Sequence, residues 1–454
     1  MNFFLLGKRP CLLVTRSLFL GLGWMALAAS AFSASNSSSE IVHLTLDQSV
    51  QKALEFSIGI KAEKNQSLKA FHQWRSRKAR LWPQISLLGS YKYVDVIPAV
   101  RIGSNQLSLG YRNNYSLGPE LSYSLFDGGQ LRSFSESAEE IYKHTLYKMD
   151  SVRKNVVLAT RRAYVKAQLA QAKLALAKKS YALAKTQFMD VGVRHRSGAA
   201  SRVDYLAAHS EVTRYHIQEI RAEQELSIVV VELNSLLGEF REQGARVTYS
   251  VDPLELAVKD LAVSLAFEGS VDHHPDLLSD DHLISSFKWS VGGRRAAFLP
   301  QIRLFARTSL DYPNGPIDEQ INQNIFGVNL NWTIWDWGSI DEEKQEAQAQ
   351  FESAQNLREQ KRLNLLRDLN KSRTLMTSLL NQKTEVEKLV RESTELAGLN
   401  FSAYRYGKLK FADVQNANLQ RLETEKQLAE LQGEILTQYY FVQFLLSQGS
   451  ELEN

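Results

Sequence analysis

Cysteine is nearly absent from the 454-residue chain, because Cys11 is the only one. Cys11 lies in an apolar leader, so a chain without that leader would have no disulfide, no thiol chemistry and no cysteine metal site. The sequence also lacks a nucleophile elbow, a phosphate-binding loop and an HExxH pattern. We therefore expect no catalytic residue, no metal and no cofactor.

Excess charge of one sign is also lacking. The formal net charge is +4, and Lys8, Arg9 and Arg16 supply three of these charges before the first acidic residue, Glu40. The rest of the chain is close to neutral, which gives a nucleic-acid partner no electrostatic support. No apolar run after the leader approaches the ~20 residues of a membrane-spanning helix, which excludes a helical inner-membrane transporter.

The leader itself, residues 1–34, is predicted to be a signal peptide. A basic start precedes the mostly apolar run Leu18–Ala29, and the small residues Ala29–Ala31 suit signal-peptidase cleavage. A membrane anchor is the alternative, but the apolar run is short for a span of ~20 residues.

Glycine and proline are absent from two long stretches, Gln130–Val191 and Ser339–Ala397. Some sixty uninterrupted residues would form a helix of roughly 90 Å, far beyond a typical globular helix, so coiled-coil packing is expected. Shorter return helices are predicted from about Ser201 to Leu237 and from Phe411 to Leu446.

Two similar nonapeptides separate the long helices from the return helices. Arg196–Asp204 and Arg405–Asp413 each contain one glycine followed by an Asp six residues later, at a constant offset (407 − 198 = 209; 413 − 204 = 209). We interpret this offset as a tandem repeat, in which each repeat contains a helical hairpin with a tight tip. The predicted parts are repeat one (35–238), a linker (239–263), repeat two (264–447) and a tail (448–454).

A β-hairpin is predicted ahead of each helical hairpin, at about 84–126 and 301–335. A helix from Leu44 to Leu81, and another from about Leu265 to Leu299, should each end before a proline. Between these prolines the offset is larger (300 − 83 = 217), so repeat one has eight extra residues, which we place in the loop between its strands. Apolar residues alternate with polar ones along all four strands: Ile85, Leu87, Tyr91, Tyr93; Tyr115, Leu117, Leu121, Tyr123, Leu125; Ile302, Leu304, Ala306, Leu310, Tyr312; Phe326, Val328, Leu330, Trp332, Ile334.

Alternation over ~10 residues with aromatic residues near the ends is typical of a membrane-spanning strand, but also of a hairpin in a soluble sheet. Four strands cannot close a membrane barrel, which needs ~8, and open strand edges in lipid are costly. Either the strands are soluble or several chains pool them. Three chains would supply twelve strands.

The chain resembles the TolC family of outer-membrane efflux and secretion channels over essentially its whole mature length. The resemblance rests on the two glycine tips and on four junctions between helices and strands: Trp82-Pro83-Gln84, Leu299-Pro300-Gln301, Leu125-Phe126-Asp127-Gly128-Gly129 and Ile334-Trp335-Asp336-Trp337-Gly338. It implies a mainly α fold with transmembrane β, in which four strands per chain join a homotrimeric twelve-stranded barrel in outer-membrane lipid. Long antiparallel helical hairpins would form an α-barrel that extends through the periplasm.

The resemblance also implies a function, that of a passive export duct for drugs, small molecules or proteins. The partners would be a periplasmic adaptor (membrane fusion) protein and an inner-membrane pump of the RND or ABC type, in an efflux pump or a type I secretion system. A soluble periplasmic coiled-coil adaptor or scaffold is the alternative, and a periplasmic enzyme is a third possibility that lacks a convergent site.

Site residues follow from the same resemblance. The adaptor is expected at the tips, on Ser197, Gly198, Ala199 and Ala200 and on Tyr406, Gly407, Lys408 and Leu409. The entrance gate is expected to include Asp204, Asp413, Tyr404 and Asn416.

The gate departs from the family pattern at two positions. Leu409 stands where the pattern has an arginine, and Asn416 stands where it has a second Asp. A threefold ring of Asp413 would still favour cations, with weaker selectivity than two stacked rings. The alternative is that Asp204 and Asp413 cap the return helices, since Asp suits helix starts. By similar reasoning, His273-His274-Pro275-Asp276 is predicted to be a loop or helix cap, because no further ligands with metal-site spacing accompany it.

Overall fold

The computed structural model of the chain describes residues 41–103, 105–239, 248–254 and 270–446. All of them belong to one unit, Glu40–Asn454. The predicted signal peptide, the tail 448–454 and most of the linker 239–263 lie outside the described residues.

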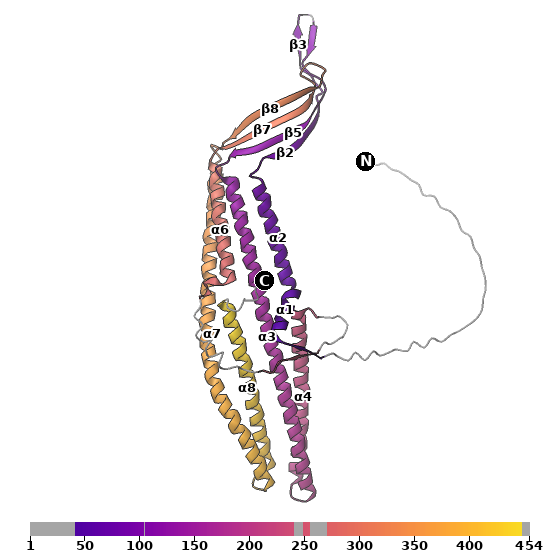
Figure 1. Cartoon of the computed structure of the whole chain (residues 1–454), viewed down its shortest axis with the longest axis vertical. Helices are drawn as coiled ribbons and strands as arrows, with labels where there is room; N and C mark the ends of the chain where they lie inside the picture. Colours follow the sequence, from indigo (N-terminus) through magenta and orange to yellow (C-terminus); the bar gives the residue numbers. More distant parts are fainter. Residues whose placement is uncertain (1–40, 104, 240–247, 255–269, 447–454) are drawn as a thin grey trace, which may run out of the picture. The chain divides into compact units, whose positions relative to one another are not determined.

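The four predicted strands form one antiparallel sheet (Figure 1). They are β2 (Gln84–Tyr93), β5 (Asn113–Phe126), β7 (Gln301–Tyr312) and β8 (Ile321–Asn331), in the order β2-β5-β7-β8. The last strand ends three residues before the predicted Ile334. Asn331, the last residue of β8, pairs with Gln301, the first residue of β7, so β7 has no further residue with which β8 could pair.

The strand register confirms the predicted alternation. Ile85 lies opposite Leu121, Leu121 opposite Ala306, and Ala306 opposite Phe326, so the apolar residues share one face of the sheet. Glu120 lies opposite Arg307 on the polar face.

The connection between β2 and β5 is longer than that between β7 and β8, as the offsets predict. It spans residues 94–112 and contains a small hairpin of β3 (Ala99–Ile102) and β4 (Asn105–Ser108). The second connection spans only residues 313–320.

Two helices of 67 residues dominate the rest of the chain, and they confirm the prediction from the missing glycine and proline. They are α3 (Gln130–Arg196) and α7 (Ser339–Arg405), which begin 209 residues apart (339 − 130). The return helices, α4 (Arg202–Leu237) and α8 (Phe411–Leu445), begin at the same offset (411 − 202 = 209). Helix α4 packs on α3 and α8 on α7, which gives the two predicted helical hairpins.

Shorter helices pack next to the long helices, in the half of the helical region that is nearer to the sheet (Figure 1). Helix α2 (Ile58–Ala79) packs on α3, α3 packs on α6 (Pro275–Arg295), and α6 packs on α7. Short 3₁₀ turns at Val271–His273 and Ala296–Phe298 flank α6, which is shorter than the predicted Leu265–Leu299 helix. Within the described ranges, no helix is both long and apolar enough to cross a membrane.

The prediction of one helix from Leu44 to Leu81 is wrong. Ser57, at φ −44° and ψ 112°, leaves the helical region, and its hydroxyl accepts a hydrogen bond from the Ile60 amide at 3.3 Å. It therefore ends α1 (Leu46–Phe56) and begins α2.

Leu44 belongs instead to a strand, β1 (Ile41–Leu44), which pairs in parallel with β6 (Thr248–Val251) of the linker. This part of the predicted linker is thus a regular strand. The buried Tyr164 of α3 fixes the pair, because its hydroxyl donates to the Leu44 carbonyl oxygen at 2.9 Å and contacts Asp252 Oδ2 at 2.7 Å.

Candidate functional site at the helical tips

The same backbone motif closes both helical tips. The amide of Ala199 donates to the Arg194 carbonyl at 2.8 Å, and the amide of Gly198 donates to the His195 carbonyl at 3.1 Å. This is the Schellman pattern, in which the last free carbonyls of a helix are paired across a left-handed residue. Gly198 supplies that residue at φ +77°.

The second tip repeats the motif 209 residues later. Lys408 donates to the Ala403 carbonyl at 2.9 Å, Gly407 donates to the Tyr404 carbonyl at 2.8 Å, and the φ of Gly407 is +74°. A Cβ added to either tip glycine meets no atom within 4 Å, so the need for glycine is conformational.

Asp204 and Asp413 each occupy the third position of a return helix and cap it. Asp204 Oδ2 accepts from the Ser201 amide at 3.2 Å, while Ser201 Oγ accepts from the Asp204 amide at 3.0 Å, which completes a capping box. Asp413 Oδ2 accepts from the Lys410 amide at 3.1 Å. The capping alternative is therefore present in the structure, and a pore role for the same carboxylates stays a prediction.

Tyr404 lies in a buried cluster between the two hairpins rather than on the surface. It is 4% exposed and packs with Val191 of α3, Ala208 of α4, and Phe411 and Val414 of α8. Its ring meets Phe411 edge-on, with 5.3 Å between the ring centroids.

An arginine of the other hairpin covers Tyr404. The Arg194 guanidinium lies 5.2 Å from the Tyr404 ring centroid, and its Nη1 donates to the Arg405 carbonyl. In return, Arg405 Nε lies 3.6 Å from Asp190 Oδ2. The end of α3 and the end of α7 are thus joined by two reciprocal contacts.

Burial raises the pKa of Tyr404, the Asp204 carboxylate raises it further, and Arg194 opposes the shift. The Tyr404 hydroxyl has no hydrogen-bond partner among the described residues. Tyr404 is therefore uncharged near neutral pH.

Sequence reasoning missed Arg194, Asp190 and Arg405. Arg194 and Arg405 are 211 residues apart. Arg405 opens the second tip nonapeptide, but the repeated glycine and Asp that identify the tips give no sign that it contacts the other hairpin. The one signal in the sequence is the arginine of the family pattern, whose position Leu409 occupies in this chain.

The remaining predicted tip residues are mostly exposed. Tyr406 is 82% exposed and Leu409 37%. Asn416 is exposed on α8, while Ala200 is half-buried. The Asp204 carboxylate is therefore near enough to raise the pKa of Tyr404, whereas Asn416 is exposed and lies outside the buried cluster around Tyr404.

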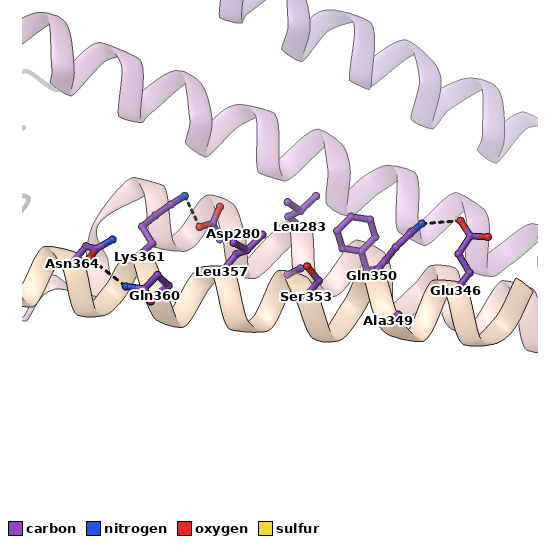
Figure 2. Close-up of a pocket in the computed structure, with 12 residues that line it drawn as sticks. Asp280, Leu283, Glu346, Ala349, Gln350, Ser353, Leu357, Gln360, Lys361 and Asn364 are labelled. Atoms are coloured by element: carbon purple, nitrogen blue, oxygen red, sulfur yellow. Dashed lines mark hydrogen bonds and ion pairs between the residues drawn. The ribbon is translucent and has the colours of Figure 1, made fainter. Parts of the chain in front are cut away.

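No other part of the described chain offers a stronger chemical site. It contains no group of three or more His, Cys, Asp or Glu side chains that could hold a metal ion. His274 caps α6, as predicted, because its Nδ1 accepts from the Asp276 amide at 3.3 Å. A groove of about 890 Å³ runs between α6 and α7 (Figure 2) and has no catalytic arrangement of side chains.

Comparison with known proteins gives a consistent result. Residues 49–239 and 270–446 match the family described as outer membrane efflux protein. The outer membrane protein OprJ of Pseudomonas aeruginosa is 25% identical over 329 residues, which cover 69% of this chain and 67% of OprJ. The toluene efflux pump outer membrane protein TtgF of Pseudomonas putida is 25% identical over 198 residues, 43% of this chain and 40% of TtgF.

The fold is also that of a solved outer membrane protein. The crystal structure of VceC from Vibrio cholerae superposes with a TM-score of 0.75 at 15% identity, over 89% of this chain and 97% of VceC.

Proposed function

This chain belongs to the outer membrane efflux protein family, and we propose that three copies of it form the outer-membrane duct of a tripartite efflux pump. The observation that supports this most is the sheet, whose apolar face is exposed and whose two outer strands, β2 and β8, have a free edge. Three such sheets joined edge to edge would give twelve strands without any edge left in lipid.

The exposed face argues against the soluble adaptor or scaffold. Ile85 is 76% exposed, Leu87 71%, Phe326 80% and Val328 63%, and all four lie on the same face. An apolar face of this kind is stable in lipid and would promote aggregation in water.

The two tips are the proposed docking surface for a periplasmic adaptor, which would connect the duct to an inner-membrane pump of the RND or ABC type. Their rigid Schellman turns and exposed neighbours give a partner a fixed shape to bind. The name of TtgF, a toluene efflux pump component, favours efflux of small molecules over type I protein secretion. The duct itself needs no catalytic residue, because the pump would supply the energy.

Substitution at the tips tests the docking proposal. Gly198→Trp and Gly407→Trp should abolish efflux of a fluorescent dye while heat-resistant trimers stay visible on a gel. Gly103→Trp is the matched control, because Gly103 also has a positive φ, +66°, and also lacks atoms within 4 Å of an added Cβ. Normal efflux from both tip variants would contradict the proposal that the tips bind the adaptor.

A fractionation experiment tests the duct itself. The protein should require detergent for extraction and should conduct ions in planar bilayers. Recovery wholly in the soluble periplasmic extract would contradict the proposal.

A further inference from the structure

Strands and helices follow the same lateral order in this chain. The sheet runs β2-β5-β7-β8, and the helices that continue these strands run α2-α3-α6-α7 (Figure 1). Helix α2 is therefore the margin of the helix layer on the β2 side, and α7 is its margin on the β8 side. A second copy that pairs its β2 with β8 must also bring its α2 to α7.

We propose that the first third of α7 binds α2 of a second copy of this chain through an electrostatic seam that sets the direction of assembly. The seam consists of α2 (Ile58–Ala79) on one copy and residues 339–360 of α7 on the other. It rests on the proposed trimer and adds to it the residues that recognise the neighbour.

Helix α2 is strongly basic, and its cations have no carboxylate partner in the part of the chain that the structure describes. It has six basic residues and one acidic residue, Glu63, which gives +5 over 22 residues. None of the six forms an ion pair with any side chain in the described ranges. They are Lys61, Lys64, Lys69, Arg75, Arg77 and Lys78, and all are exposed.

The facing stretch of α7 is acidic to a similar degree. Residues 339–360 contain six acidic and two basic residues, a balance of −4 over the same length of 22 residues. Among the described residues, Glu342, Glu346 and Glu352 have no cationic partner, and Glu346 and Glu352 accept only amide hydrogen bonds from Gln350 and Gln348.

The direction of the two helices matches these charges. Helix α2 runs toward the sheet and ends with Arg75, Arg77 and Lys78, whereas α7 starts at the sheet with Asp341, Glu342 and Glu343. In an antiparallel pair, the most basic turn of one copy would lie beside the most acidic turn of the next. The opposite direction would separate them by most of the length of α2, roughly 33 Å.

Each of the two helices also has a row of exposed residues that suits close packing. On the exposed side of α7, residues Glu346, Ala349, Ser353 and Leu357 recur in steps of three and four, and they line the groove of about 890 Å³ against α6 (Figure 2). Leu357 is 67% exposed. Small residues at such steps allow close helix packing.

The outward side of α2 has a corresponding row. Ile58, Ala62, Asn65, His72 and Ala79 lie on the side opposite Ser67 and Ala70, which are buried against α3. Ile58 is 70% exposed, so this row, like the groove, has apolar surface without cover in the single chain.

Charge exchange tests the seam in the full-length protein. Glu342→Lys with Glu346→Lys should reduce the yield of heat-resistant trimers about tenfold, and Lys69→Glu with Arg75→Glu should do the same. All four substitutions together should restore at least half of the trimer, because the seam regains opposite charges.

The control keeps the helix and the change in net charge but moves the site. Glu392→Lys with Glu395→Lys alters two exposed residues of α7 that lie beyond the reach of α2, and it should leave the trimer unchanged. Circular dichroism would verify that each variant keeps its helices. Failure of the fourfold variant to regain trimers, or full trimer yield from both reversals, would overturn the seam.

Cross-linking identifies the occupant directly, since the chain has only Cys11 as a native cysteine. Copies with Ala62→Cys, co-expressed with copies with Ser353→Cys, should form a covalent dimer with a short bifunctional thiol reagent. Ala62→Cys with Thr394→Cys should not. A product that links Ser353→Cys to a different protein would overturn the assignment of this surface to a second copy.

The two proposals can fail separately. If the charge-reversal variants still form trimers and still support efflux, the proposed duct is unaffected and only the proposed seam is contradicted. A wild-type chain that never forms a trimer would contradict both.

Discussion

The two tip glycines show how a single residue can be required for its backbone alone. Gly407 has a φ of +74° and open space around it, so its substitution is limited by conformation and not by contact. Gly398 lies nine residues before Gly407, inside α7, and has equally open space and a helical backbone. An added Cβ meets no atom at either position, so a difference between the two substitutions reports the backbone conformation alone.

We predict that Gly407→Ala destabilises the tip by about 1–2 kcal/mol, because a Cβ disfavours the left-handed region. Amide hydrogen exchange at the end of α7 should accelerate about tenfold. Gly398→Ala should slow exchange in the same turn, since alanine stabilises a helix interior by up to ~1 kcal/mol relative to glycine. Equal exchange in both variants would show that the Schellman turn does not depend on Gly407.

His274 gives a second residue-scale prediction. It is fully buried and caps α6 through Nδ1, and it meets Phe444 edge-on with 5.1 Å between the rings. Burial lowers the pKa of His274; Asp276 opposes this, while Lys154 and Lys361 lower the pKa further. In the unfolded chain the imidazole regains its ordinary pKa of ~6.5.

The sign follows from these two states. Above about pH 6.5, His274 is neutral in the folded and in the unfolded chain, so its contribution to stability is fully present. Below that pH the unfolded chain binds a proton at His274 and the folded chain does not, so the free energy of unfolding falls. The protection factor against hydrogen exchange in the first turn of α6, which corrects for the intrinsic pH dependence of exchange, should therefore fall from pH 7 to pH 5. His274→Asn replaces the capping nitrogen with a capping oxygen and removes the titration, so the same pH change should lower the protection factor less.

At the scale of elements, the sheet depends on a close approach between β5 and β7. A Cβ on Gly118 would lie 1.9 Å from the Thr308 carbonyl oxygen, which is backbone and cannot move aside without separating the strands. A Cβ on Gly89 of β2 would lie 3.2 Å from Leu117 Cδ1, the end of a flexible side chain.

We expect Gly118→Ala to cost about 3 kcal/mol or more and to prevent formation of the sheet, because neither strand can yield. Gly89→Ala should be tolerated after a small rotation of Leu117. The yield of heat-resistant trimers measures both. Normal trimers from Gly118→Ala would mean that β5 and β7 lie further apart than described.

The elements also mark the limit of sequence-based reasoning. The long helices α3 and α7 follow from missing glycine and proline, and the strands follow from alternation, because both signals are local. The break at Ser57 was missed, since a serine can lie inside a helix or cap one, and the outcome depends on packing. The parallel pair of β1 and β6 was missed because its strands are four residues long and about 200 residues apart.

At the scale of the whole molecule, the gate remains the main prediction. Asp413 caps α8, and a threefold ring of its carboxylates would also favour cations in the proposed duct. The cap was recoverable from the sequence as an alternative. The Arg194–Tyr404 contact was not, because it joins two hairpins whose pairing no local pattern specifies.

Asp413→Asn separates the two roles, since asparagine keeps a capping oxygen and removes the charge. We expect lower cation selectivity in bilayer recordings with unchanged trimer yield. Asp413→Ala should lower selectivity to the same extent and also loosen the start of α8 by about 1 kcal/mol. Unchanged selectivity in both variants would restrict Asp413 to capping.

The two tips have the same backbone and different side chains, and this has a consequence for symmetry. Around the glycine of one tip, Ser197, Ala199 and Ala200 are small and uncharged, whereas around the glycine of the other, Tyr406, Lys408 and Leu409 are larger and include a cation. A ring of three copies would present six turns of two alternating chemistries. The ring would then have approximate sixfold symmetry in its main chain only. A partner that recognises side chains would find threefold symmetry and two different kinds of binding site.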